Sequence, residues 1–163
     1  MLYGYGGFEI SLKPSYSAVT GAAWLAHGGI HVVANIRGGG EFGPRWHQAA
    51  LREQRQNAFD DFIAVAEDLI ARKLSSPRHL GIMGGSNGGL LVGAVMTQRP
   101  ELFQAVVCQV PLLDMRRYHQ LLGRRLVDGR VRRPRPGSGL GIHCPLFALP
   151  PGAQPASATR ASC

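Results

Sequence analysis

Apolar segments that suit strands alternate with segments that suit helices along the first three quarters of the chain. This alternation constrains the fold more than any other feature, because strands separated by helices need right-handed crossovers and form a mainly parallel sheet. The predicted strands are residues 1–5, 30–36, 79–83 and 105–110. The predicted helices are residues 17–27, 57–73 and 87–98. We therefore expect an α/β fold in the order β-α-β-α-β-α-β.

Two of these segments carry more detailed expectations. Residues 57–73 have the clearest helical pattern, in which Phe59, Phe62 and further apolar residues recur at i, i+3, i+4 spacing. Asn57 is of a type that often caps a helix, so we expect it at the N-cap. Residues 30–36 are mostly apolar and β-branched, which is typical of a strand buried on both faces.

Charge and composition divide the chain near residue 122. The whole chain has 163 residues and a net charge of +8. Residues 1–122 hold 11 basic and 9 acidic side chains, whereas residues 123–163 hold 7 Arg, 1 Asp, 6 Gly and 6 Pro without a periodic apolar pattern. We predict a folded unit over residues 1–122 and an irregular, Arg/Gly/Pro-rich tail over residues 123–163.

Three interpretations of this tail stay open, and a disordered tail is the preferred one. The Arg cluster at residues 130–135 also suits a nucleic-acid arm, but it lacks an aromatic stacking platform and a recognised module, so nucleic acid is not the expected partner. The third interpretation is an out-of-frame translation, because the codons for Arg, Gly, Pro and Ala are GC-rich.

Several other classes of protein are disfavoured. No apolar run reaches the roughly 18 residues that a membrane span needs, and the N-terminus lacks the pattern of a secretory signal. The cysteines, Cys108, Cys144 and Cys163, are odd in number and too scattered for a disulfide framework, which favours the reducing cytoplasm. We expect no metal or other cofactor.

Residues 84–88, Gly-Gly-Ser-Asn-Gly, match the G-x-S-x-G pattern of a serine nucleophile between a strand and a helix. Glycines permit the tight turn, and a strained backbone raises the hydroxyl clear of the sheet. The helix that follows points its N-terminus at the site, where the backbone N–H of Asn87 is suited to bind an oxyanion. Ser86 is thus the predicted nucleophile. The alternative, a glycine-rich turn with an incidental serine, is disfavoured by the strand–turn–helix context.

A serine nucleophile needs a histidine base and an acid that orients it, and in this type of fold the acid and then the histidine follow the serine. The acids downstream of Ser86 are Glu101, Asp114 and Asp128, and the histidines are His119 and His143. Asp114 follows the last predicted strand, but His143 lies in the patternless tail. The acid and the base of a triad are therefore not identifiable from the residues.

Five stretches of the chain together resemble the catalytic domain of the prolyl oligopeptidases. They are residues 2–8, 34–43, 57–62, 84–91 and 98–103. The resemblance covers roughly residues 2–122 and implies a partial α/β-hydrolase fold. It also implies hydrolysis of short peptides on the carboxyl side of proline, through an acyl-enzyme on Ser86.

The resemblance assigns roles to three further residues. It implies an oxyanion hole formed by the Tyr5 hydroxyl together with the Asn87 N–H, and it puts Phe8 in the pocket for the substrate proline. Without the resemblance, the sequence favours a different interpretation of Tyr5 and Phe8, namely ordinary packing at a strand end. Short proline-containing peptides are accordingly the expected partners.

The chain also departs from the family's pattern. Nothing corresponds to the family's β-propeller domain, and the family's catalytic Asp and His, with a Trp of the proline pocket, lie beyond the match. We therefore expect an incomplete catalytic domain that is weakly active or inactive by itself. A non-catalytic peptide-binding fragment is the alternative. Exposed sheet edges and apolar surface also predict self-association or aggregation.

Overall fold

The computed structural model describes residues 1–114, which form a four-stranded sheet and the helices around it. The strands are β1 (Leu2–Gly4), β2 (Val32–Ala34), β3 (Gly81–Gly85) and β4 (Ala105–Gln109). Neighbouring strands are parallel throughout, in the order β2-β1-β3-β4, which confirms the predicted α/β class. The predicted boundary at residue 122 and the tail, with His119, His143, Cys144 and Cys163, lie outside the described residues.

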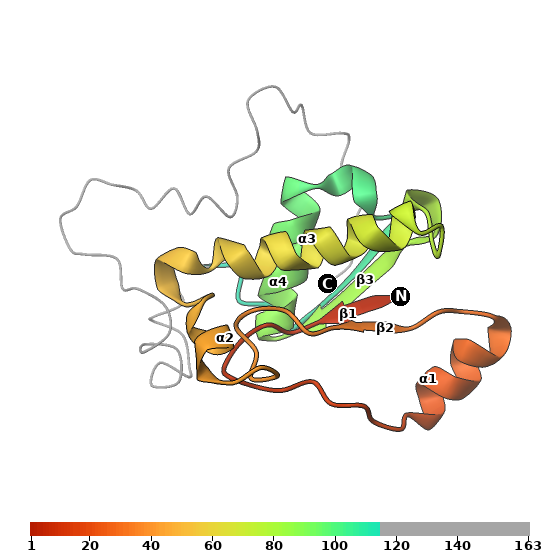
Figure 1. Cartoon of the computed structure of the whole chain (residues 1–163). Helices are drawn as coiled ribbons and strands as arrows, with labels where there is room; N and C mark the ends of the chain where they lie inside the picture. Colours follow the sequence, from red (N-terminus) through yellow and green to blue (C-terminus); the bar gives the residue numbers. More distant parts are fainter. Residues whose placement is uncertain (115–163) are drawn as a thin grey trace.

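The α-helices of this part of the chain are α1 (Ala18–Ala23), α2 (Pro44–Gln48), α3 (Gln56–Ala71) and α4 (Asn87–Gln98). Short 3₁₀ helices cover Leu25–His27, Arg52–Gln54, Pro77–His79 and Pro100–Leu102. Figure 1 shows α3 and α4 together over one face of the sheet, whereas α1 lies at the end of a long arm away from the sheet. The sequence did not predict α2, because five residues are too few for a periodic apolar pattern.

The core lies between the sheet and these two long helices. Phe59 and Phe62 of α3, Leu91 and Val95 of α4 and Leu2 of β1 are all fully buried. Their helical spacing puts the apolar side chains of α3 on one face, which is the face that packs against α4 and the sheet. The apolar pattern of residues 57–73 therefore predicts both the helix and the side that it buries.

The predicted N-cap of α3 is wrong. The helix begins at Gln56, so the capping position belongs to Arg55, whose side chain makes no capping hydrogen bond. Asn57 lies inside the first turn, and its side-chain amide instead donates to the carbonyl oxygen of Ala49 (2.7 Å). The amide thus ties α3 to the segment before it, a tertiary contact that competes successfully with the local capping preference.

The prediction that β2 is buried on both faces is also wrong. Within residues 1–114 it is an outer strand of the sheet, and Val33 is 44% exposed whereas Ala34 is 3% exposed. Side chains alternate between the two faces of a strand, so Ala34 faces the helices and Val33 faces the other way. Val33, Tyr3, Met83 and Val107 are partners across the sheet and form one row, here called the open face.

We expect the open face and the outer strands to make the chain self-associate, because apolar surface and unpaired strand edges favour contacts between copies. Replacing Val33 and Val107 together by Lys should lower this association. Both positions are about two-fifths exposed, so a lysine there keeps its charge in water while disrupting the apolar row. Sedimentation velocity over a range of concentrations measures the effect.

The matched control is Val19→Lys on α1, where the side chain is 77% exposed and lies away from the sheet. This variant should associate as the unaltered chain does. An unaltered chain that stays monomeric and unfolds in one sharp cooperative transition would contradict the expectation.

Candidate active site

Ser86 lies at the junction between β3 and α4, as its sequence pattern predicts. Its φ of 55° and ψ of −113° form a left-handed backbone conformation that strains a residue with a Cβ. Two backbone hydrogen bonds hold it there: the Ser86 N–H donates to the Gln109 oxygen (2.9 Å), and the Ser86 oxygen accepts from the Leu90 N–H (3.1 Å). The residue is exposed, which is the condition that a nucleophile must meet.

Close packing explains two of the glycines around Ser86. A Cβ on Gly84 would lie 2.2 Å from the Gly88 oxygen, and a Cβ on Gly88 would lie 2.5 Å from the Gly4 oxygen. Both obstacles are backbone atoms, so neither can turn aside as a side chain would. At Gly85, by contrast, the nearest atom would be at an ordinary contact distance of 3.6 Å. Gly84 and Gly88 thus let β1, β3 and α4 meet just below Ser86.

Asn87 joins the end of β1 to the start of α4. Its side chain is buried, and its Nδ2 donates to the backbone oxygen of Tyr5 (2.5 Å). Asn87 is the first residue of α4, and the first backbone N–H groups of a helix have no acceptor within the helix. The structure therefore brings into contact the two residues from which an oxyanion hole is expected, with Ser86 next in sequence to one of them.

Phe8 lies on the loop that follows β1. Its ring centre is 6.4 Å from that of Tyr5, and the two rings are tilted by 46°. Phe8 and Glu9 both have left-handed φ values, 56° and 58°, so the loop bends sharply here. The buried His47 supports the bend, because its Nδ1 lies 2.7 Å from the Gly38 oxygen and 3.2 Å from the Glu9 nitrogen. The half-buried Phe8 ring is thus held near Tyr5.

Sequence reasoning missed Arg55, which reaches the same place from the turn before α3. Its Nη1 donates to the Gly6 oxygen (2.5 Å) and its Nη2 donates to Asn87 Oδ1 (3.2 Å). Burial lowers the pKa of Arg55 to about 10, and the interaction with Tyr5 opposes that shift. A basic residue at the start of an amphipathic helix normally faces solvent, so the sequence carries no signal for this contact.

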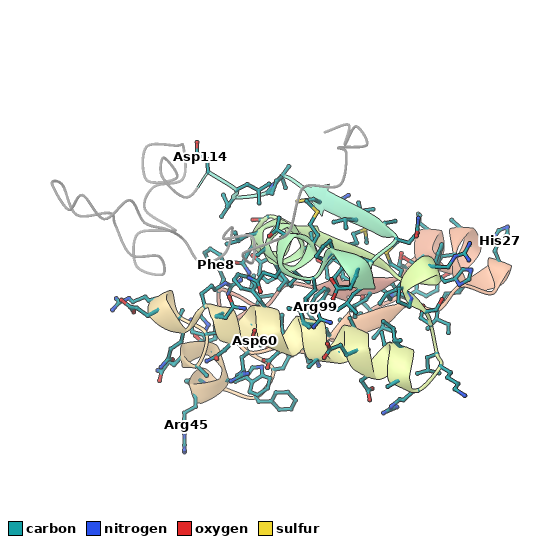
Figure 2. The ribbon with its side chains drawn as sticks, turned by 90° about the horizontal axis from the view of Figure 1, so that it is seen from above. Phe8, His27, Arg45, Asp60, Arg99 and Asp114 are labelled. Carbon is teal, nitrogen blue, oxygen red and sulfur yellow. The ribbon has the colours of Figure 1, made fainter. Side chains whose placement is uncertain are left out.

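Residues 1–114 place no histidine on Ser86. His47 is engaged with the Gly38 loop, and His79 contacts the Ser76 hydroxyl (2.9 Å) before β3, at the end of that strand opposite to Ser86. His27 lies at the far end of the molecule from Phe8 (Figure 2). His31 directly precedes β2 and so lies at the same far end of the sheet.

Asp114, the candidate acid, is half-buried on the segment after β4. The base and the acid therefore remain unassigned.

Within residues 1–114, no group of three or more His, Cys, Asp or Glu side chains is placed to hold a metal ion. None of the helices described has the length and apolar character needed to cross a membrane.

Comparisons with known proteins give a consistent result. The model of the prolyl oligopeptidase family matches residues 14–130, a range that contains Ser86 and Asn87 and begins after Tyr5 and Phe8. An uncharacterized peptidase of Sinorhizobium fredii is 66% identical over 115 residues, which cover 71% of this chain and 16% of the relative. A prolyl endopeptidase of Elizabethkingia miricola is 50% identical over 120 residues, which cover 74% of this chain and 17% of the relative.

Solved structures agree with these matches. A post-proline cleaving enzyme from Rickettsia typhi has a TM-score of 0.80 and 51% identity, and the match covers 82% of this chain and 19% of that protein. The chain thus spans about a sixth to a fifth of the length of the relatives that it matches. The parallel sheet and its flanking helices have the α/β-hydrolase architecture of these neighbours. The chain belongs to the prolyl oligopeptidase family.

Proposed function

We propose that this chain supplies the nucleophile and the oxyanion hole of a serine peptidase that cleaves short peptides on the carboxyl side of proline. The observation that carries the proposal is the strained, exposed Ser86 between β3 and α4, beside the contact of Asn87 with Tyr5. The names of two relatives, a prolyl endopeptidase and a post-proline cleaving enzyme, support the choice of substrate.

In the proposed reaction, Ser86 Oγ attacks the carbonyl carbon of the substrate proline and passes its proton to a base. The carbonyl oxygen becomes an oxyanion that accepts hydrogen bonds from the Asn87 N–H and the Tyr5 hydroxyl. These bonds strengthen as charge builds on the oxygen, which lowers the barrier rather than merely tightening substrate binding. The amide C–N bond then breaks, the protonated amine leaves, and water hydrolyses the acyl-serine.

Phe8 is the proposed wall of the apolar pocket for proline. A rigid pyrrolidine ring gains contact area against an aromatic face at a small entropic cost. The loop bend at Phe8 and Glu9 and the support from His47 hold that face near Tyr5.

The reducing cytoplasm is the proposed location. Cys108, whose thiol donates to the Gly89 oxygen (3.3 Å), is compatible with it.

We further propose that this chain by itself hydrolyses such peptides weakly or not at all. The reason is that residues 1–114 hold no histidine hydrogen-bonded to Ser86, and loss of the base costs on the order of a millionfold in kcat. A fluorogenic peptide amide cleaved after proline measures the turnover. Rapid turnover by the purified chain would contradict this part of the proposal and leave the assignment of Ser86 intact.

Labelling by a fluorophosphonate probe tests the nucleophile. Ser86 Oγ forms a bond to phosphorus, fluoride leaves, and the hydroxyl proton passes to solvent. We expect slow labelling, confined to Ser86 by peptide mass spectrometry and absent from Ser86→Ala. Ser76→Ala is the matched control, because Ser76 lies before β3 and not at the site, and it should label as the unaltered chain does.

Two results would count against the nucleophile. One is labelling spread evenly over several serines, and the other is labelling that survives in Ser86→Ala. Binding of a proline peptide that is unaffected by Ser86→Ala, together with no labelling, would instead favour a non-catalytic peptide-binding role.

A further inference from the structure

The guanidinium of Arg55 lies against both segments that carry the expected oxyanion donors. It donates to the Gly6 oxygen on the loop after β1 and to Asn87 Oδ1 at the start of α4. Its Cζ is also 5.4 Å from the ring centre of the buried Phe59, so the cation rests on an aromatic face. A single side chain thereby links the end of β1, the start of α4 and the helix α3.

The positive charge of Arg55 has no carboxylate partner within the described part of the chain. Arg37, Arg72 and Arg99, in contrast, all form salt bridges there. A charge that is largely removed from water and not neutralised costs stability, and the pKa of Arg55 is accordingly lowered to about 10. At neutral pH the group nevertheless remains charged, so it keeps a positive potential beside Tyr5 and Asn87.

The contact with Arg55 also sets the orientation of the Asn87 side chain. A guanidinium only donates hydrogen bonds, so the atom that faces Arg55 must be the amide oxygen. This orientation leaves Nδ2 to donate to the Tyr5 oxygen. A reversed amide would bring two oxygens together at Tyr5 and two donors together at Arg55. Arg55 therefore fixes the link between the two residues expected to bind the oxyanion.

We propose that Arg55 is a positioning residue of the oxyanion hole, which holds Asn87 and the Tyr5–Gly6 segment in place and favours negative charge at the site. This role rests on the function proposed above, since it needs an anion to form on a group bound to Ser86. The role predicts that Arg55 matters more for an anionic adduct than for a neutral ligand in the same pocket.

Two ligands separate these effects. The first is acetyl-glycyl-boroproline, in which a boronic acid replaces the proline carboxyl; Ser86 Oγ bonds to boron, the hydroxyl proton passes to solvent, and boron becomes four-coordinate and negative. The second is the neutral acetyl-glycyl-proline amide. Titrations at pH 8, below the pKa of Arg55, give the dissociation constants, and ¹¹B NMR reports the four-coordinate boron.

We expect Arg55→Met to weaken binding of the boronic acid about tenfold and to change binding of the neutral amide less than about twofold. Arg72→Met is the matched control, because Arg72 directly follows the other end of α3 and its side chain is 63% exposed in a salt bridge with Asp68. It should change neither dissociation constant. Equal weakening of both ligands by Arg55→Met, or of neither, would overturn the role of Arg55.

Arg55→Lys is a second variant, which keeps the test decisive if Arg55→Met does not fold. It keeps the charge but loses the planar fork that spans the Gly6 oxygen and Asn87 Oδ1, so boronic acid binding should weaken about threefold. Circular dichroism shows whether each variant folds. If Arg55→Met does not fold, a folded Arg55→Lys that binds the boronic acid as tightly as the unaltered chain would overturn the role. If the unaltered chain and Ser86→Ala bind the boronic acid equally, no adduct forms, and the proposed function fails together with this role.

Discussion

Replacing Gly84 by alanine is expected to lower the free energy of unfolding by about 3 kcal/mol or more, because the new methyl group has no space. The added Cβ would lie 2.2 Å from the Gly88 oxygen and 2.5 Å from the Gly88 carbonyl carbon. Relief requires α4 to move away from β3, and α4 also packs on β1 and β4. Urea unfolding followed by circular dichroism measures the loss.

Gly85→Ala is the matched control, one residue further along the same strand. A Cβ there has its nearest neighbour, Gln109 Oε1, at 3.6 Å, so the change in unfolding free energy should stay within about 0.5 kcal/mol. Slow labelling of Ser86 by the fluorophosphonate should also survive in Gly85→Ala and disappear in Gly84→Ala. Equal stabilities of the two variants would show that the strand and helix are not packed as closely as described.

The alternation of apolar segments was enough to predict the class of the fold and most of its elements. The helix α4 runs from Asn87 to Gln98, which are the residues predicted, because a glycine-rich turn precedes it and Pro100 follows it. The errors concern tertiary position. Residues 30–36 have the apolar content of a central strand, yet β2 is an outer strand in residues 1–114 with Val33 exposed, and local composition does not distinguish the two.

The candidate site likewise combines residues that the sequence predicts with contacts that it does not predict. Ser86 and the Asn87 N–H follow from a contiguous pattern whose glycines have a local steric cause. The contact of Asn87 with Tyr5 joins residues 82 positions apart, and that of Arg55 with Asn87 joins residues 32 apart. No periodicity or spacing in a single sequence encodes such pairs. The resemblance to a family indicates Tyr5 and Phe8, whereas Arg55 is revealed only by its contacts in the folded structure.

Arg37 is another residue whose long-range contact the sequence does not predict, although it lies within a recognisable motif. Its stretch, residues 34–43, contributes to the resemblance but suggests no role for the arginine. In the structure, its guanidinium and its backbone N–H all bind Asp61, with distances of 2.6 to 2.9 Å, and this hydrogen bonding raises the pKa of Arg37. The pair ties the chain after β2 to α3, and so it supports the segment that runs from Gly38 to helix α2, which carries His47.

Phe62→Ala is expected to lower the free energy of unfolding by about 3 to 5 kcal/mol, the usual cost of removing a fully buried phenylalanine ring. The ring lies directly on Gly4, where a Cβ would come within 2.5 Å of Phe62 Cε2. The cavity would therefore open beneath the end of β1, next to Tyr5. Phe42→Ala is the matched control: Phe42 is 68% exposed and contacts Trp46 edge-on, so its loss should cost about 1 kcal/mol or less.

A double-mutant cycle with Gly4→Ala tests whether Phe62 acts through this contact. In the unaltered chain, a methyl group at position 4 would lie 2.5 Å from Phe62 Cε2 and 2.9 Å from Leu91 Cδ2. Gly4→Ala should therefore be strongly destabilising. In the Phe62→Ala background the nearest obstacle is gone and the methyl group enters the new cavity. Gly4→Ala should then cost at least about 1 kcal/mol less. Additive losses would mean that α3 does not press on β1 at Gly4, and that the strand end leading to Tyr5 is positioned by α4 instead.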